Sequence, residues 1–186
     1  MTSTYQPTAN LAARSAETRD RRPLLFLLAA LTVALDQLTK FLIIRHVRSG
    51  EHITVIPRVF RISHVLNTGA AFSFLDESAH PDAVRYGLIA FSIFAVIIVG
   101  AMIARTGRAL SLSGIALALI LGGALGNLYD RIVHHFVIDF LEVHIIGYHW
   151  PDFNVADSAI CIGATLLILE IFRPQPAEAS ALPPSS

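Results

Sequence analysis

The fold class of this chain is decided by one stretch, NVADSAICIGATLLILEIF, which runs from Asn154 to Phe172. Most of it is apolar enough to lie in a bilayer, yet the carboxyl group of Asp157 stands at its start. A charged side chain at the centre of a membrane helix costs roughly 2.5 to 3.5 kcal/mol on insertion scales, and such side chains face a polar interior. We therefore expect a membrane helix whose Asp157 faces other polar groups.

The composition of the whole chain agrees with the membrane class. Of its 186 residues, 54% are hydrophobic and only 15% are charged, against about a quarter in ordinary soluble domains. The formal net charge is zero and the arginines are scattered, so no nucleic-acid partner is expected. Cys161 is the only cysteine, which excludes an intrachain disulfide and a thiolate metal cluster.

Four apolar segments each approach the roughly 20 residues that span a bilayer core. They predict one membrane domain, residues 23–173, with helices at about 23–44, 84–104, 109–131 and 155–172. The polar ends, 1–22 and 174–186, are expected to be disordered tails. The first apolar segment follows a basic lead, but no small-residue cleavage site comes after it, so a retained helix is favoured over a cleaved leader.

The connections between these helices differ in character. The link between the second and third helices is short, whereas two longer segments lie between the other helices. Residues 51–66 combine β-branched and aromatic residues with a turn at Pro57-Arg58, which predicts a small surface hairpin or sheet. Residues 133–152 are rich in aromatic residues and histidine, and we expect them to be part strand and part interfacial segment. The predicted fold is an all-α membrane bundle of four transmembrane helices with a small β-structure in its first outer loop.

The arginines indicate an orientation. Those near the two termini and in the short connection are Arg14, Arg19, Arg21, Arg22, Arg105, Arg108 and Arg173. About as many basic residues lie on the other side, but in long segments where the positive-inside rule has little force. Both termini are therefore expected to be cytoplasmic.

The costly polar residues converge on the outer face of such a bundle. They are Asp36 and Lys40 in the first helix, Asn127, Asp130 and Arg131 in the third, Asp139 beyond it, and Asn154 and Asp157 at the start of the fourth. Several such groups on one face predict a shared polar cavity between the helices. All eight histidines fall on the same side without the spacing of a metal site, so no metal is expected.

Most of these residues also have a purely structural interpretation. Asp36 and Lys40 are spaced to pair along one helix, and Asn154 and Asp157 have the spacing of a capping box. The three polar residues of the third helix fit an ordinary helix end. Asp139 has the weakest structural reason for its place, because it lies in the apolar context FVIDFLEV.

Two aspartates can carry a specific chemistry. Carboxyl groups within hydrogen-bonding distance cannot both ionise, so they share one proton and titrate as a unit. The ionised group then activates a water as general base, while the protonated group polarises a carbonyl and later protonates the leaving amine. Asp139 and Asp157 are thus candidates for peptide hydrolysis without a metal, and the chain shows no G-x-S-x-G, H-E-x-x-H or phosphate-binding glycine loop.

Five blocks resemble the signature blocks of lipoprotein signal peptidase, or signal peptidase II, a family of bacterial intramembrane aspartyl proteases. The blocks are DQLTK (36–40), NTGAAF (67–72), GGALGNLYDR (122–131), VIDF (137–140) and FNVADS (153–158). They occur in the family's order and are spread over most of the chain between the tails. The resemblance implies a membrane endopeptidase that removes signal peptides from prolipoproteins, cutting before the diacylglyceryl-modified cysteine.

The resemblance also implies a role for each block. Asp139 and Asp157 would be the catalytic dyad, and a hydrophilic shell would bind substrate or support the site through Asp36, Lys40, Asn67, Gly69, Asn127, Asp130, Arg131 and Asn154. Within that shell, Arg131 is expected to hold carboxylates, with Asp130 as a candidate partner, and Gly69 to supply a turn. The β-structure would be a cradle resting on the membrane.

The same resemblance implies the surroundings of the enzyme. It would need no cofactor, act as a monomer in contact with lipid, and lie in the bacterial inner membrane with its site near the periplasmic face.

Two alternative functions stay open from the residues alone. A proton- or ion-coupled transporter would also use intramembrane acids, although its relay should continue across the membrane, and a scaffold protein would use them to join helices.

Overall fold

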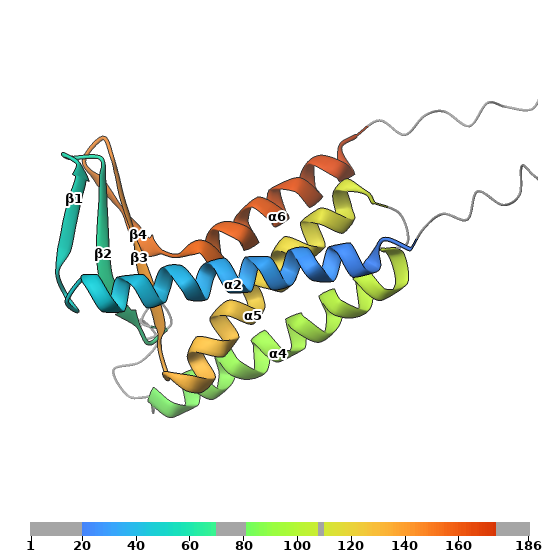
Figure 1. The fold of residues 1–186 in the computed structure, drawn as a ribbon, viewed down its shortest axis with the longest axis horizontal. Coiled ribbons are helices and arrows are strands. Elements are labelled where there is room, and N and C mark those ends of the chain that lie inside the picture. The colour runs from blue at the N-terminus through green and yellow to red at the C-terminus, as the bar shows by residue number, and fades with distance from the viewer. Residues whose placement is uncertain (1–19, 70–80, 108–109, 174–186) are drawn as a thin grey trace, which may run out of the picture.

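The computed structural model describes residues 20–69, 81–107 and 110–173 (Figure 1). The predicted tails, 1–22 and 174–186, lie outside these residues except for positions 20–22. The last three residues of the NTGAAF block, 70–72, also lie outside them.

Four long helices make up the body of the molecule. They are α2 (Arg22–His46), α4 (Pro81–Thr106), α5 (Leu112–Val133) and α6 (Val155–Ile171). Each boundary lies within three residues of the predicted range. Among the described residues, α2, α4 and α5 are long and apolar enough to cross a membrane, so the chain is a multi-pass membrane protein. The 17 residues of α6 fall short of that length criterion.

Local sequence signals set the helix ends. Proline occupies the first turn of α2, where its missing N–H removes no helical hydrogen bond. The Ser111 hydroxyl caps α5 by accepting a hydrogen bond from the Gly114 amide at 3.0 Å. Asn154 caps α6 in the same way, so α5 and α6 both begin after residues that favour the N-cap position.

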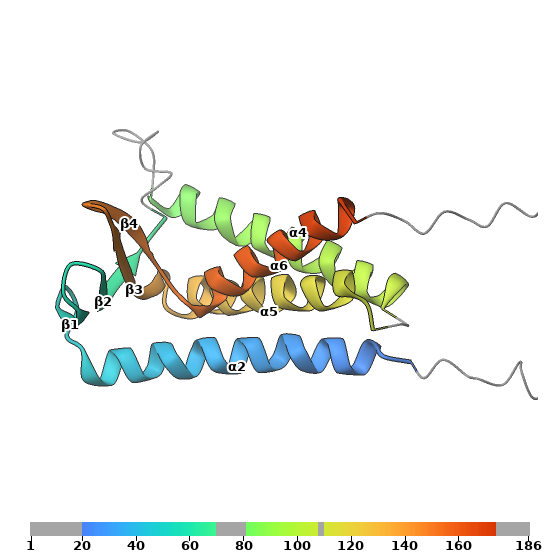
Figure 2. The same ribbon diagram turned by 90° about the horizontal axis from the view of Figure 1, so that it is seen from above.

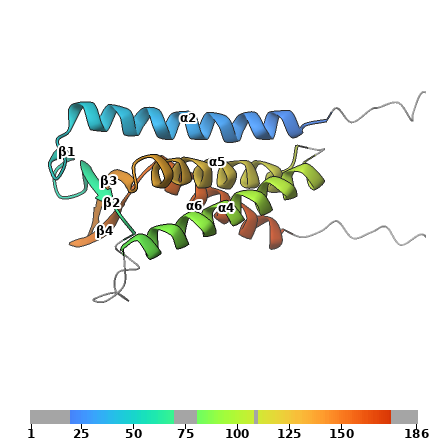
Figure 3. The same ribbon diagram turned by 90° about the horizontal axis from the view of Figure 1, so that it is seen from below.

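Helix α5 lies at the centre of the bundle. It packs against α2, α4 and α6, whereas α2 and α4 barely touch each other, and Figures 2 and 3 show α5 between them. Glycine permits the close approach of α2, because a Cβ on Gly122 would lie 2.6 Å from the Thr32 Cβ and 2.7 Å from the Ala29 carbonyl oxygen. Such small-residue contacts drive helix association in lipid, where the hydrophobic effect cannot.

The outward faces of the helices are apolar. On α4, the side chains of Phe91, Phe94 and Ile97 are 69%, 62% and 64% exposed. A contiguous apolar surface of this kind marks an interaction site rather than an ordinary soluble surface. On a membrane-spanning helix, the partner of such an apolar surface is lipid.

An antiparallel sheet covers one end of the bundle, opposite to the end where α2 begins and α6 ends (Figure 1). Its strands, in spatial order, are β1 (His52–Ile56), β2 (Phe60–Asn67), β3 (Val137–Ile145) and β4 (Tyr148–Phe153). The expected turn at Pro57-Arg58 separates β1 from β2, and Arg58 has a φ of 65°.

The sheet is larger than the β-structure predicted for the first outer loop. The hairpin expected in residues 51–66 is present as β1 and β2, and the part-strand segment expected in residues 133–152 supplies the other two strands of the same sheet. The pairing of β2 with β3 joins the two segments, with Val65 opposite Asp139. Local residue preferences indicate extended backbone but not its long-range partner, so the sequence could not predict this pairing.

A small apolar cluster fixes the sheet to the bundle. It contains Ile43 and Val47 at the end of α2 and Ile138 and Phe140 on β3, all buried. The cluster holds β3 against the helices, and the side chain between Ile138 and Phe140 belongs to Asp139. Packing of apolar neighbours therefore fixes the place of a carboxyl group.

Candidate active site

The ten site residues predicted from the sequence meet where the sheet joins the bundle. They come from α2, β2 and the turn after it, α5, β3 and α6, and hydrogen bonds or ion pairs connect all of them. The structure therefore brings together residues that lie up to 121 positions apart, from Asp36 to Asp157.

The first part of this set is a buried ion network between α2 and α5. The Lys40 ammonium donates to Asp36 at 2.7 Å, to Asp130 at 2.8 Å and to the Asn127 side-chain oxygen at 3.2 Å. These contacts use all three donors of the ammonium. Lys40 is 1% exposed, and both carboxylates are fully buried. We name Asp36, Lys40 and Asp130 the ion network.

Backbone amides also donate to both carboxylates of the ion network. Asp36 accepts a hydrogen bond from the Ala156 amide in the first turn of α6, at 2.9 Å. Asp130 accepts one from the Ile138 amide of β3, at 3.3 Å. The network thus ties α2 and α5 to both elements that carry Asp139 and Asp157.

Two asparagines link the ion network to those aspartates. Asn127 accepts from Lys40 and donates to Asp157 at 2.7 Å. Asn154 donates to Asp139 at 2.7 Å and to the Asn127 side-chain oxygen at 3.2 Å. A primary amide suits this position because it carries both donors and an acceptor.

Asp139 lies on β3 and is only 2% exposed. Its two oxygens accept from the amides of Asn154 at 2.7 Å and Asn67 at 2.9 Å. Burial raises the pKa of Asp139 to about 6, and the negative charge of Asp157 adds to the rise while the two amide hydrogen bonds oppose it. The carboxyl group is therefore easier to protonate than an ordinary aspartate.

Asp157 lies in the first turn of α6 and completes the capping box predicted from its spacing. The Asn154 side chain accepts from the Asp157 amide at 2.9 Å, and the Asp157 carboxylate accepts from the Asn154 amide at 3.2 Å. Its other oxygen is free to accept from Asn127 and borders a cavity. Within the part of the chain that the structure describes, no hydrogen bond joins Asp139 directly to Asp157.

The cavity is an apolar groove with one polar end. Its volume is about 320 Å³, and residues of α4, α5 and α6 line it. The apolar lining includes Leu88 and Phe91 of α4, whereas the polar end is formed by Asn127, Arg131 and Asp157. A long apolar segment with one polar bond fits this distribution.

Two residues of the predicted shell, Gly69 and Arg131, differ in whether the structure shows the contact expected of them. The turn expected at Gly69 is present: Gly69 has a φ of 92°, and its amide donates to the Asn67 side-chain oxygen at 2.8 Å. Arg131, by contrast, donates to the Asn127 carbonyl oxygen at 3.3 Å. Among the described residues, it forms no ion pair with Asp130, because Lys40 takes that carboxylate.

Sequence reasoning missed one residue of this network. The Gln37 side-chain amide donates to Asp130 at 2.9 Å and to Asp36 at 3.2 Å, bridging the two carboxylates opposite Lys40. Gln37 stands inside the DQLTK block beside Asp36. The available signal in the sequence was a side-chain amide, that of Gln37, next to an acid inside an apolar helix.

Comparisons with known proteins agree with the geometry. A family model described as Signal peptidase (SPase) II matches residues 28–173. Curated lipoprotein signal peptidases include those of Alteromonas mediterranea, 42% identical over 78% of this chain and 79% of the relative, and of Syntrophotalea carbinolica, 44% identical over 81% and 91%. That of Pseudomonas syringae pv. tomato is 46% identical over 78% of this chain and 84% of the relative.

A solved structure shares the fold. It is described as a bacterial membrane enzyme determined by the in meso method at 1.9 Å resolution, and it superposes with a TM-score of 0.74 at 28% identity. The match covers 86% of this chain and 99% of that chain. The helices, the sheet and the sequence blocks therefore lead to one conclusion, which is that this chain belongs to the signal peptidase II family.

Proposed function

We propose that this chain is the endopeptidase that removes signal peptides from prolipoproteins, cutting before the diacylglyceryl-modified cysteine. Its curated relatives are named lipoprotein signal peptidases, and its family is that of signal peptidase II. The observation that carries the proposal is the pair Asp139 and Asp157, which two linked asparagines connect, with Asp157 at the polar end of an apolar groove.

The two aspartates take different roles. Asp139 holds the shared proton, since its pKa is raised to about 6 and amides rather than cations contact it. Asp157 borders the cavity and acts as the base. Asn154 and Asn127 keep the two carboxyl groups in place, because each donates to one of them and they contact each other.

The reaction follows from these roles. A water attacks the carbonyl carbon of the scissile bond while its proton passes to Asp157. Asp139 donates a hydrogen bond to the carbonyl oxygen as negative charge develops there. Collapse of the tetrahedral intermediate breaks the C–N bond, one proton goes to the leaving amine, and the pair again holds one shared proton.

The groove between α4, α5 and α6 is the proposed site for the signal peptide. Its apolar wall at Leu88 and Phe91 suits an apolar segment that enters from lipid, while the scissile bond reaches the polar end at Asp157. The lipid chains of the modified cysteine stay in the bilayer, each buried methylene contributing about 0.8 kcal/mol of anchoring. Anchoring of enzyme and substrate at one depth supplies much of the required positioning.

The same proposal includes a membrane arrangement. The 17 residues of α6 give about 25 Å of helix at 1.5 Å per residue, which is close to the hydrocarbon thickness. We take α6 as a fourth span packed on α5, in a single domain from 23 to 173. Both termini are then cytoplasmic, the site lies near the periplasmic face of the inner membrane, and one chain in contact with lipid provides a full site.

The test uses purified full-length protein in lipid and a diacylglyceryl-modified prolipoprotein, with cleavage followed as a gel shift. We expect Asp139→Asn and Asp157→Asn each to lower the rate at least about a hundredfold, the scale of a lost acid or base. Asp82→Asn is the matched control, because Asp82 lies at the start of α4, where Arg85 contacts it and its side chain is 75% exposed.

Each variant must keep the unfolding temperature of the parent within a few degrees for the comparison to count. Normal cleavage by Asp139→Asn would rule out the aspartate mechanism. A parent that never cleaves the modified substrate would rule out the activity itself and return the transporter and scaffold alternatives.

A further inference from the structure

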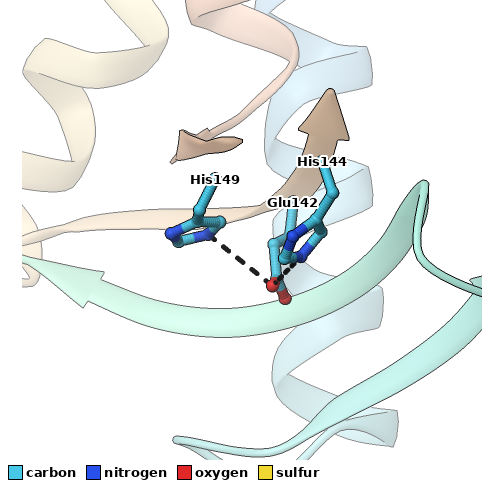
Figure 4. Close-up of side chains that lie close together, drawn as sticks. All are labelled: Glu142, His144 and His149. Carbon is cyan, nitrogen blue, oxygen red and sulfur yellow. Dashed lines mark hydrogen bonds and ion pairs between the residues drawn. The ribbon is translucent and has the colours of Figure 1, made fainter. Parts of the chain in front are cut away.

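A second cluster of chemistry-bearing side chains lies on the sheet, outside the site described above. Glu142 and His144 are two residues apart on β3, so their side chains leave the strand on the same face. His149 of β4 is the direct cross-strand partner of His144. Figure 4 shows the two imidazoles on either side of the Glu142 carboxylate.

A tight hairpin sets this arrangement. The loop between β3 and β4 is the dipeptide Ile146-Gly147, with φ values of 50° and 83°, as in a type I′ turn. Such a two-residue loop fixes the register and therefore places His149 opposite His144. The backbone thus determines which three side chains meet.

The donor atoms are close enough to share one ion. Oε1 of Glu142 lies 2.6 Å from Nε2 of His144 and 3.6 Å from Nε2 of His149. One donor atom from each of the three residues lies within 4.8 Å of the other two. Bonds of about 2.0 to 2.2 Å put two donors on one tetrahedral ion roughly 3.3 to 3.6 Å apart, so binding requires small side-chain rotations that lengthen the contact between Glu142 and His144 and bring the three donors to this spacing.

The kind of donor selects the kind of ion. Two imidazoles and one carboxylate suit zinc and its neighbours in the first transition row, whereas magnesium and calcium prefer oxygen ligands alone. Three protein ligands leave a further position for water. Asp152 is a further carboxylate near the cluster, with its Oδ2 3.7 Å from Nε2 of His149.

One cation already competes for the carboxylate. The guanidinium of Arg61, on β2, donates to Oε1 of Glu142 at 3.2 Å. The side chain of Arg61 is 33% exposed, against 11% for Glu142, so the guanidinium has a path toward solvent. An ion at the two histidines would displace Arg61 rather than be excluded by it.

We propose that Glu142, His144 and His149 bind one divalent transition-metal ion of the zinc type, which clamps the β3–β4 hairpin. The site is distinct from Asp139, which lies three residues earlier on β3 and, by the alternation of the strand, on its other face. The ion stabilises the folded sheet by mass action because it bridges two strands.

Sequence reasoning predicted no metal from these histidines. The pair E-x-H on β3 is short and common, and His149 joins it only through the register of the hairpin. The spacing of these residues along the chain is therefore too common to predict a metal site. The pairing of β3 with β4 is what shows that the three side chains meet.

The test uses the purified full-length protein in detergent, with any affinity tag removed so that no extra histidines are present. Zinc binding is measured by competition with a chromophoric chelator, with magnesium and calcium as comparison ions. We expect one zinc ion per chain, and a loss of affinity of at least about tenfold in His144→Ala and in His149→Ala, the scale seen even for outer-shell changes. His46→Ala is the control, because His46 is exposed at the end of α2 and bonds only to its own helix.

A variant with the opposite expectation makes the test sharper. Arg61→Gln removes the competing cation and should tighten zinc binding several-fold, while a mere charge cluster would lose a partner and gain nothing. Cobalt added to the parent gives a second measurement that needs no variant, since bound cobalt with few ligands shows visible absorption.

The outcomes are separable. Stoichiometric zinc binding that His144→Ala and His149→Ala weaken, together with a cobalt spectrum, supports the site. Zinc binding equal in parent and both variants, or no zinc binding and no cobalt spectrum in the parent, overturns it. Cleavage activity does not enter either result, so the outcome is independent of the proposed function.

Discussion

Two pairs of carboxyl groups lie side by side in this molecule, with Asp157 the one that is only partly buried, and their partners differ. In the ion network, Asp36 and Asp130 contact the ammonium of Lys40 at 2.7 and 2.8 Å. In the other group, the donors to Asp139 and Asp157 among the described residues are all amides, chiefly those of Asn67, Asn127 and Asn154. Asn127 belongs to both groups, so the change from cation to amide takes place across a single side chain.

This difference separates structure from chemistry. A cation beside a carboxylate favours its charged form and holds it in an ion pair. An amide orients a carboxyl group without supplying charge, and at Asp139 burial raises the pKa to about 6. The ion network therefore joins helices, while the second pair is suited to acid–base work, and the predictions below test that division from the largest expected effect to the smallest.

Lys40→Met should destabilise the protein most. The change keeps the length of the side chain but leaves Asp36 and Asp130 buried without their shared cation. Removing one partner of a buried ion pair costs about 3 to 5 kcal/mol. Thermal unfolding in detergent, followed by the fluorescence of Trp150, measures the loss.

Asp157→Asn provides the contrast on the other side of Asn127. It should leave the unfolding temperature nearly unchanged because no cation loses its partner. Equal destabilisation by Lys40→Met and Asp157→Asn would mean that the two groups are one structural network and that the division is wrong.

The pH dependence of stability should differ between the parent and Asp139→Asn. The folded state raises the pKa of Asp139 from 3.8 to about 6, so it binds this proton more tightly than the unfolded chain does. The free energy of unfolding of the parent therefore falls as pH rises from 4 to 7, by about 2 kcal/mol from this group. Unfolding temperatures across that range should show the fall in the parent and a flatter course in Asp139→Asn. Parallel courses would contradict the raised pKa.

The helices were largely predictable from the sequence because apolar length alone indicates a span. The position of Asp157 in the first turn of a helix was also predictable. Its spacing from Asn154 at the start of an apolar segment is that of a capping box, and the structure has that box. These features depend on residues within four positions of each other, where side-chain direction follows from helix geometry.

The sheet and the partners of Asp139 were not predictable in the same way. Its apolar context marked Asp139 as unusual, but its donor Asn67 lies 72 positions away and reaches it only because β2 pairs with β3. For Arg131, the resemblance offered Asp130 as a candidate partner, whereas Lys40 of another helix contacts that carboxylate at 2.8 Å. In both cases, contacts between residues far apart in the sequence determine the partner of the carboxylate.

A matched pair of changes at Asn154 separates its two roles. Asn154→Ser keeps a side-chain cap for α6 but removes the amide that donates to Asp139, so cleavage should fall about tenfold with little change in stability. Asn154→Ala removes both and should also lower stability by about 1 kcal/mol. Initial rates with the modified substrate, beside unfolding temperatures, measure the two effects. Full activity in Asn154→Ser would show that the amide does not position Asp139.

Glu51→Gln should have the smallest effect, and it tests whether pairing or burial stabilises the ion network. Arg48 and Glu51 form an ion pair of 3.9 Å whose side chains are 88% and 61% exposed. Exposed pairs contribute between about 0 and 1 kcal/mol because water screens both charges, so the unfolding temperature should change by no more than a degree or two. A loss as large as that in Lys40→Met would mean that charge pairing stabilises this protein wherever it occurs. A negligible loss means that the cost of Lys40→Met comes from burial, which water cannot relieve at Asp36 and Asp130 but can relieve at Glu51.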